Sequence, residues 1–540
     1  MSGIAPRNIA VRTVSQNPDS PATSPSGQSA ANHGAVGSSR SSELASARND
    51  ALDGKEPGGG CTLFVDQVGN GDQDFGCWSG RSLPNLAVGS DFDISTELAR
   101  IPDIEEDGSN EELVHSMWKS KRKHFIILSA SGKPIYSRHG SNAVVSSYAG
   151  IIQTILSFYQ SSGNSLRSFA SGQTRFVIQA QGNLLLLAIS RLFESESQLS
   201  SQLEALYLQI LSTLTLPNLR HIFSIKPSTD LQRPLRGTEV LLSSLADGFI
   251  RGSPVTLLSA LESLKLRKFH REAVSNTLLK SRVDDLLYGL IVAGGRLVSV
   301  VRPRKHSLHP GDLMLIFNML FEAGGVQAGG GESWIPICLP GFNPNGFLYM
   351  FVSFLNLADT IHQDTRDENI AKEDAVAIIL ISANKESFES VRRMKDYLVM
   401  ELEKNKSLLA IQAAVQSERP SLTEILPGHV LRHFLYKSKN DVQFCMPSFS
   451  AFETLSKRRS LFSIYHELHA AVHQKHTSVR AHHITRPTYK TFAWITTDFE
   501  LYCVGRSDAS RNALVQNANK IVRWIHKEEE RLFVVGGGVF

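Results

Sequence analysis

The sequence has few cysteines and no long uninterrupted apolar run. The five cysteines are Cys61, Cys77, Cys338, Cys445 and Cys503, and no two of them form a C-x-x-C pair. An odd number at irregular spacing is typical of a reducing compartment and argues against a disulfide framework or a cysteine-ligated zinc site. The longest apolar runs, at 184–189 and 375–383, are far shorter than the roughly 18 residues that span a bilayer, and the N-terminus lacks the apolar core of a secretory signal.

Neither sign of charge dominates the sequence. Lysine and arginine number 56 and aspartate and glutamate 52, which gives a formal net charge of +4. A nucleic-acid-binding protein usually has a strongly basic domain, so we expect no nucleic-acid partner. The apolar fraction of 42% over 540 residues is enough for three or four cores at about 150 residues per domain.

The common catalytic motifs are absent. The sequence contains no P-loop of the form GxxxxGK[ST] and no GxSxG elbow. The best metal candidate is a set of four histidines, His466, His469, His473 and His476, which fall on an arc roughly 80° wide if the segment is helical. A histidine-rich flank of a half-buried helix explains this spacing equally well. We therefore expect no catalytic residue, metal or cofactor, and a histidine-dependent metal hydrolase is only a third hypothesis.

The N-terminal region 1–117 has the composition of a disordered segment. Residues 1–60 contain 11 serines and 8 glycines but no phenylalanine, tyrosine or tryptophan, so they cannot bury enough apolar area to offset the entropy of ordering. The stretch 91–112 then carries nine carboxylates against a single arginine, and a basic cluster at 119–123 follows it. The acidic stretch could fold back on the basic cluster, or both could be solvated charge runs.

Strand and helix patterns recur in the same order three times after residue 118. The first copy has strand patterns at 124–129, 174–180 and 184–190, and apolar helical stripes at 144–159 and 199–214. The later copies show this order in pattern only, without a repeat of the residues themselves. The sequence therefore predicts an α/β protein with units at 118–285, which includes linking helices, 286–405 and 428–540.

Two short segments concentrate basic side chains. Their cations are Lys265, Arg267, Lys268 and Arg271 in the first segment and Arg302, Arg304 and Lys305 in the second. Such clusters can bind anionic lipid head groups, with about 1 kcal/mol from each well-placed cation. An ordinary solvated surface is the alternative interpretation.

Six stretches carry a family resemblance. They are KHFIILSASGKPIYSR (123–138), SLHPGDLMLIFNML (307–320), ESWIPICLPGFNPNGFLYMFVSFL (332–355), LRHFLYKSKNDVQF (431–444), RPTYKTFAWITTDFELYC (486–503) and VRWIHKEEERLF (522–533). Together, and in this order, they resemble the Mon-one family of vacuolar fusion proteins, also called the SAND family. The chain departs from the family pattern in its first 115 residues, in a glycine-rich loop at 324–331 and at its short glycine-rich C-terminus.

The resemblance implies three longin-like domains, each a mainly antiparallel sheet with flanking helices. It also implies a heterodimer with a Ccz-one-type subunit that acts as a guanine-nucleotide exchange factor for a Rab-seven-type GTPase in endosome maturation, vacuole or lysosome fusion and autophagy. The complex would be cytoplasmic and recruited peripherally to late endosomes and the vacuole or lysosome by a Rab-five-type GTPase and anionic phosphoinositide membranes. A non-catalytic longin scaffold or tether is the alternative.

The resemblance also indicates where the GTPase platform would lie. In the family the first longin domains of the two partners pack together and form it, which corresponds to residues 118–220 here. We expect the interface residues in the first hairpin and the helix after it: Lys133, Pro134, Ile135, Tyr136, Tyr148 and Ile152. For Ile135 and Ile152, a place in the hydrophobic core is the competing interpretation.

Overall fold

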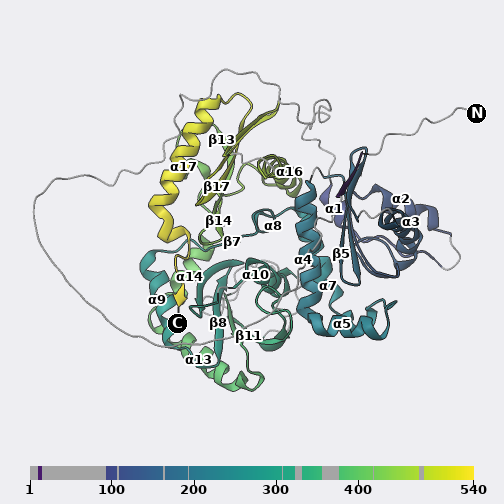
Figure 1. Ribbon diagram of the computed structural model, residues 1–540. Coiled ribbons are helices and arrows are strands. Elements are labelled where there is room, and N and C mark those ends of the chain that lie inside the picture. Colours follow the sequence, from purple (N-terminus) through teal and green to yellow (C-terminus); the bar gives the residue numbers. More distant parts are fainter. Residues whose placement is uncertain are drawn as a thin grey trace, which may run out of the picture. The chain divides into compact units, whose positions relative to one another are not determined.

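The structure is a computed structural model, in which part of the chain is described (Figure 1). The described residues are 10–14, 93–105, 109–161, 165–192, 194–306, 308–322, 331–355, 376–417, 419–473 and 480–539. Most of the predicted disordered segment and of the glycine-rich loop at 324–331 lie outside them. Two short helices, α1 (Ile94–Leu98) and α2 (Glu111–Ser120), fall within the predicted disordered range 1–117, so ordered structure begins before residue 118.

The first longin domain is built on an antiparallel sheet with helices on both faces. In sheet order its strands are β1 (Ala10–Val14), β4 (Ser165–Ser171), β5 (Thr174–Gln181), β6 (Leu184–Ser190), β2 (Lys123–Ser129) and β3 (Pro134–Ser137). Alternate residues of β2 point to opposite faces. Phe125 and Ile127 pack in the cluster that contains α4 (Glu196–Leu214). Ile126 and Leu128 pack in the cluster that contains α2 and α3 (Asn142–Ser161).

The second longin domain repeats the order of the five strands from β4 to β3, and its sixth strand lies at the opposite edge. Its sheet contains β10 (Glu332–Ile337), β11 (Leu348–Leu355), β12 (Val376–Ser382), β8 (Leu286–Ala293), β9 (Arg296–Arg302) and β18 (Gly538–Val539). The predicted hairpin joins β8 and β9 through Gly294 and Gly295, whose φ angles of 56° and 66° explain why glycine stands at both positions. The helical elements of this domain are α10 (Pro310–Phe317), the π-helix η2 (Asn318–Glu322), the short 3-10 helix η4 (Lys385–Ser387), α13 (Phe388–Lys404) and α14 (Ser407–Gln416).

The third longin domain has the same core order. Its sheet contains β15 (Ala481–Thr485), β16 (Tyr489–Ile495), β17 (Phe499–Arg506), β13 (Leu431–Ser438), β14 (Gln443–Cys445) and β7 (Leu261–Glu262). Its helices are α15 (Leu422–Ile425), α16 (Leu455–Val472) and α17 (Arg511–Leu532). The buried stripe of α16 includes Leu461, Tyr465 and Leu468, as the apolar spacing predicts. The prediction of three longin-like α/β units is thus confirmed.

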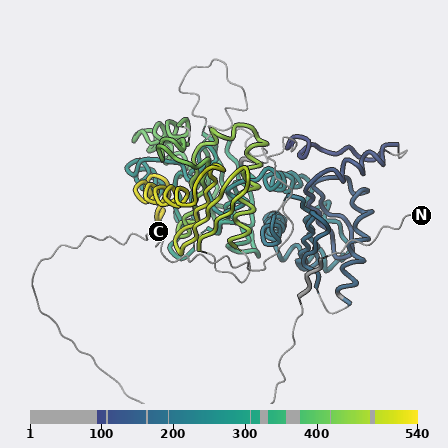
Figure 2. The backbone as a smooth tube through the Cα atoms, turned by 90° about the horizontal axis from the view of Figure 1, so that it is seen from above, coloured from purple at the N-terminus to yellow at the C-terminus, as the bar shows by residue number. Residues whose placement is uncertain are grey.

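Segments from outside two of the domains complete their sheets. The linking helices after the first domain are α5 (Leu216–Ile225), α6 (Gln232–Leu235), α7 (Glu239–Arg251), α8 (Pro254–Leu258) and α9 (Lys268–Lys280). Between α8 and α9, β7 pairs in parallel with β14 of the third domain. β18, which follows the third domain, pairs in parallel with β9 of the second. The C-terminus therefore returns to α9 and the second sheet (Figures 1 and 2), and the second and third domains share strands.

Glycine is required where β18 meets β9. A Cβ atom on Gly538 would lie 2.7 Å from Cγ2 of Val301, closer than packed atoms approach each other. We predict that Gly538→Val displaces β18 and lowers the free energy of unfolding by about 1–3 kcal/mol, the usual cost of overpacking. Denaturant unfolding measures this loss. The matched control is Gly248→Ala on α7, where a Cβ atom meets nothing within 4 Å, and an equal loss in both variants would contradict the prediction.

Candidate functional site

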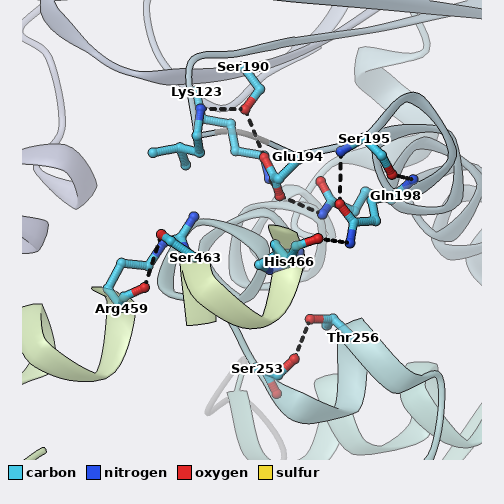
Figure 3. Close-up of polar contacts among 12 residues, drawn as sticks. Lys123, Ser190, Glu194, Ser195, Gln198, Ser253, Thr256, Arg459, Ser463 and His466 are labelled. Atoms are coloured by element: carbon cyan, nitrogen blue, oxygen red, sulfur yellow. Dashed lines mark hydrogen bonds and ion pairs between the residues drawn. The ribbon is translucent and has the colours of Figure 1, made fainter. Parts of the chain in front are cut away.

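A buried ion pair lies where the first domain meets the third (Figure 3). Lys123 begins β2 and Glu194 follows β6, and neither side chain is exposed to solvent. The Nζ atom of Lys123 lies 2.6 Å from Oε1 of Glu194. The same carboxylate accepts hydrogen bonds from Oγ of Ser190, at 2.8 Å, and from Nε2 of Gln202, at 2.9 Å. These donors satisfy a charge that burial alone would make costly.

The third domain contributes a second buried cation to this cluster. Arg459, on α16, is 1% exposed and donates from Nη1 to Oγ of Ser463 at 3.1 Å. Its guanidinium interacts electrostatically with Glu194 and with Glu97 of α1. The Nε2 atom of Gln198, on α4, donates to the backbone oxygen of His466 at 3.2 Å. The carboxylates of Glu194 and Glu97 in the first domain thus partly neutralise the charge of Arg459 in the third domain.

The electrostatics keep this cluster ionised. Burial lowers the pKa of Lys123 to about 8, against the opposing effect of Glu194. Burial alone would raise the pKa of Glu194, but Lys123, His466 and Arg459 lower it to about 2. Burial also lowers the pKa of His466 to about 3, so its imidazole is neutral. Because the paired side chains are fully covered, they can position the two domains but cannot meet a substrate.

Part of the acidic stretch folds back on the basic cluster, one of the two alternatives left open by the sequence. Oε1 of Glu97 accepts hydrogen bonds from the backbone amides of Arg122 and Lys123, at 2.8 and 3.0 Å. The ammonium of Lys121 donates to backbone oxygens at the end of α1, including that of Ala99 at 3.0 Å. α1 is therefore part of the first domain, whereas Lys119 and Arg122 keep exposed side chains.

The predicted interface residues of the first domain divide into two groups. Lys133 is exposed, and Pro134, Tyr148 and Ile152 are half-buried. Ile135 and Tyr136, however, are 8% and 5% exposed and pack in the core beneath α4 and α7. For Ile135 the competing interpretation as a core residue holds, and for Tyr136 the interface prediction is wrong, because β3 turns both side chains toward α4 and α7.

Of the exposed apolar side chains of this region, one is adjacent to a predicted residue and two lie elsewhere. Ile151 and Phe158 of α3 are 58% and 68% exposed, and Leu113 of α2 is 60% exposed. The apolar stripe at 144–159 includes both Ile151 and Ile152, so its spacing alone could not tell which of these adjacent side chains is exposed. β3, which packs against α3, is also an edge strand of its sheet.

The predicted basic residues are mostly accessible. Lys265 and Arg267 line a cleft of about 470 Å³ together with Arg296, Arg419 and Arg531. Among the remaining residues, Lys268 is exposed and pairs with Glu530 at 2.7 Å, Arg304 and Lys305 are exposed, and Arg302 is half-buried. None of the described helices is long and apolar enough to cross a bilayer.

Arg271 is an exception, and its prediction as a membrane-facing cation is wrong. Its side chain is 6% exposed. Its guanidinium donates to the backbone oxygens of Val298, Leu264 and Arg531, at 3.0, 2.7 and 3.0 Å. It therefore ties α9 to the linker before it, to β9 and to the end of α17, and a basic run in the sequence could not distinguish it from its exposed neighbours.

The four histidines considered as metal ligands are not brought together as one set. His466 turns into the buried cluster at the first domain, and His476 lies outside the described residues. His469 and His473 gather instead with Glu500 of β17. The sequence could not suggest this carboxylate, because it lies 27 positions beyond His473 in another element.

Comparisons with known proteins match all three domains. Residues 123–245, 284–400 and 430–529 match the models described as the first, second and third longin domains of FUZ, MON1 and HPS1. The chain is 42% identical over 429 residues to vacuolar fusion protein MON1 of Yarrowia lipolytica, covering 78% of this chain and 75% of that protein. It is 32% identical to vacuolar fusion protein MON1 homolog A of Gallus gallus, over 79% and 74% of the two chains. It is 33% identical to Protein SAND of Takifugu rubripes, over 79% and 78%.

The buried ion pair yields a stability prediction. Glu194→Gln leaves the ammonium of Lys123 buried without its counter-charge, so we expect a loss of about 3–5 kcal/mol in the free energy of unfolding at neutral pH. The folded-state pKa of Glu194 lies near 2, below its ordinary value of 4.5. Its stabilisation is therefore present above pH 4.5 and is lost as the pH falls toward 2. Urea unfolding of both proteins at a series of pH values from 7 down to about 3 should show their difference in the free energy of unfolding shrink below pH 4.5.

The matched control for this prediction is the double variant Lys123→Met/Glu194→Gln, which removes both charges. It should recover part of the lost stability, since an uncharged side chain of similar volume replaces the stranded ammonium. A double variant as unstable as the sum of the two single variants would show that the pair contributes nothing as a pair.

Proposed function

The chain belongs to the MON1/SAND family of vacuolar fusion proteins, and from this premise we propose that it acts in membrane fusion at the vacuole or lysosome as one subunit of a guanine-nucleotide exchange factor. The partner subunit is of the Ccz-one type, and the substrate is a GTPase of the Rab-seven type. A Rab-five-type GTPase upstream and anionic phosphoinositide membranes recruit the complex to late endosomes and to the vacuole or lysosome. The same activity serves endosome maturation and autophagy.

Exchange of this kind requires binding and no covalent chemistry. A factor that binds the nucleotide-free GTPase more tightly than the nucleotide-bound form shifts the equilibrium by that difference in affinity. It speeds release by favouring a switch conformation that no longer holds magnesium and phosphate. The work is then done by surfaces on rigid domains, and the buried cluster of Lys123, Glu194 and Arg459 supports this proposal by fixing the first domain against the third.

The observation that carries the proposal is the uncovered surface of the first domain. α3 exposes Ile151 and Phe158, and α2 exposes Leu113. The sheet ends at β3, whose outer edge is not paired within the described part of the chain. An open edge beside exposed apolar side chains is suited to docking a second longin domain, which could extend the sheet and cover the helix. Lys133, Tyr148 and Ile152 lie on the same hairpin and helix.

Membrane recruitment is supported by the basic cleft. Lys265 and Arg267 border it, and Phe269, in the first turn of α9, is 75% exposed. A cation attracts anionic head groups, while an exposed aromatic ring favours the interface between head groups and acyl chains. Glu262 and Glu424 also line the cleft, so it is not uniformly positive, and Glu262 already pairs with Arg419.

The exchange proposal predicts the effect of charges placed on α3. Ile151→Asp/Phe158→Asp should weaken co-purification with the Ccz-type partner by roughly tenfold or more, because each buried apolar side chain is worth about 1.5–3 kcal/mol. Release of a labelled GDP analogue from the Rab-seven-type GTPase should slow with it. Leu409→Asp on α14, where the native side chain is 57% exposed, is the matched control and should leave both unchanged.

The wild-type complex distinguishes exchange from the scaffold alternative. An exchange factor accelerates GDP release well beyond the GTPase alone and prefers the nucleotide-free form. A scaffold would bind the GTPase without regard to nucleotide and leave its release rate unchanged, and that outcome would refute the proposed activity. If Leu409→Asp also lost co-purification with the partner and acceleration of GDP release, the partner interface could not be assigned to α3.

The membrane proposal predicts a loss of lipid binding on charge reversal. Lys265→Glu/Arg267→Glu should weaken binding to vesicles containing an anionic phosphoinositide by about tenfold or more, at about 1 kcal/mol for each well-placed cation. Co-sedimentation at low and high salt measures the effect, which should fade as salt screens the charges. Arg220→Glu/Lys226→Glu, which changes two exposed residues on and just after the linking helix α5, is the control. Equal losses in both variants would indicate nonspecific attraction and contradict a defined site.

A further inference from the structure

Three potential metal ligands converge on the third domain, outside every surface used above. His469 lies on the last turn of α16, His473 is the residue that caps the C-terminus of this helix, and Glu500 is the second residue of β17. One ligand atom from each lies within 4.8 Å of those of the other two. The ring centroids of the two histidines are 4.1 Å apart, and Nε2 of His473 lies 3.6 Å from Oε2 of Glu500.

The fold brings these residues together for a simple reason. Residues four apart on a helix stack on one face, so the two imidazoles point the same way from α16. α16 packs on the sheet that contains β17, which places Glu500 against that face. Glu500 is 7% exposed, whereas the His473 side chain is 35% exposed. A site here would be rigid on one side and open to solvent on the other.

Existing hydrogen bonds hold the carboxylate in place. The hydroxyl of Tyr502 donates to Oε2 of Glu500 at 2.9 Å and lies 3.0 Å from Nε2 of His473. Lys439 approaches the other oxygen, Oε1, at 3.5 Å. Nδ1 of His469 lies 3.4 Å from Nε2 of Gln198 on α4 of the first domain. A cation entering the cluster would take the place now bridged by the Tyr502 hydroxyl, while Lys439 would compete with it for the carboxylate.

We propose that His469, His473 and Glu500 form a binding site for one divalent transition-metal ion. Two imidazole nitrogens and one carboxylate oxygen are a donor set that suits zinc, with water or the Tyr502 hydroxyl in the fourth position. In tetrahedral coordination, ligand atoms about 2.0–2.2 Å from the ion are about 3.4 Å from one another. The ligand atoms therefore need to move by roughly an ångström, which rotation of the half-exposed His473 can supply.

Such an ion would act as a clamp. It would join the last turn of α16 to β17, on the side of α16 where Gln198 of the first domain makes its contacts with His469 and with the backbone of His466. All three ligands belong to the third domain, so bound metal would stiffen the part of that domain that Gln198 contacts. This role is independent of nucleotide exchange, so either proposal can fail without the other.

Zinc titration of the full chain, alone and with its partner subunit, tests the site. After removal of metal with a chelator, calorimetry should show one zinc ion bound per chain with a dissociation constant in the micromolar range or below, and zinc should raise the melting temperature. Cobalt(II) should give the visible absorption of a four-coordinate site. His473→Gln and Glu500→Gln should each weaken binding by at least tenfold. His526→Gln, an exposed histidine on α17, should bind as the wild type does.

Two ligand variants, His473→Gln and Glu500→Gln, are used so that loss of zinc binding can be distinguished from misfolding. Glu500 is buried, so its substitution could destabilise the third domain, whereas His473 is half-exposed and its substitution should leave the metal-free protein stable. Zinc binding in His473→Gln equal to that of the wild type would overturn the proposed ligands. If the wild type binds zinc with a dissociation constant above about 100 μM, the cluster is a hydrogen-bond network only, in which the Tyr502 hydroxyl bridges His473 and Glu500.

Discussion

The burial of the Lys123–Glu194 pair, both members of which belong to the first domain, is the constraint on which the junction with the third domain depends. Two ions taken out of water are tolerated only if their partners are fixed, because a stranded charge in the interior costs several kcal/mol. Here the fixing groups come from β6, α4 and, through Arg459, from a helix about 260 residues away. Separating the domains would expose the pair to water and take Arg459 away from the carboxylates of Glu194 and Glu97, so these charges favour one arrangement in a way that apolar packing alone would not.

The second and third domains are joined by a different device. β7 and β18 each complete a sheet in a domain to which they do not belong in sequence, and Arg271 links β9, the linker and the end of α17. Shared strands use backbone hydrogen bonds, which are insensitive to side-chain identity, and they cannot slip without losing a whole ladder. Buried charges therefore hold the junction of the first and third domains, and backbone hydrogen bonds hold that of the second and third. Both kinds of junction keep the surfaces of the domains in fixed positions.

Sequence patterns were sufficient to predict the architecture, because the spacing of apolar residues within each strand or helix shows which of its faces is buried. The runs at 124–129 and 184–190 are buried strands, and Gly294-Gly295 is the hairpin turn that its residue types indicate. The patterns failed where the deciding partner is remote. Lys123 and Arg271 lie in basic runs that are typical of a surface, yet each is buried and paired with groups that are remote in the sequence. Glu500 became a neighbour of His473 only through the packing of α16 on its sheet.

Rigidity is also what an activity based on binding alone demands. If the platform could flex, part of the energy gained on contact with a GTPase would be spent on ordering the platform itself, and less would remain to distort the switch region. A protein that exposes Ile151 and Phe158 on one domain gains affinity from covering them only to the extent that the domain is already held in place. The buried charges and the shared strands thus keep the exposed surface of the first domain rigid. This rigidity allows weak contacts over a wide area to discriminate between the nucleotide-bound and nucleotide-free states of the GTPase.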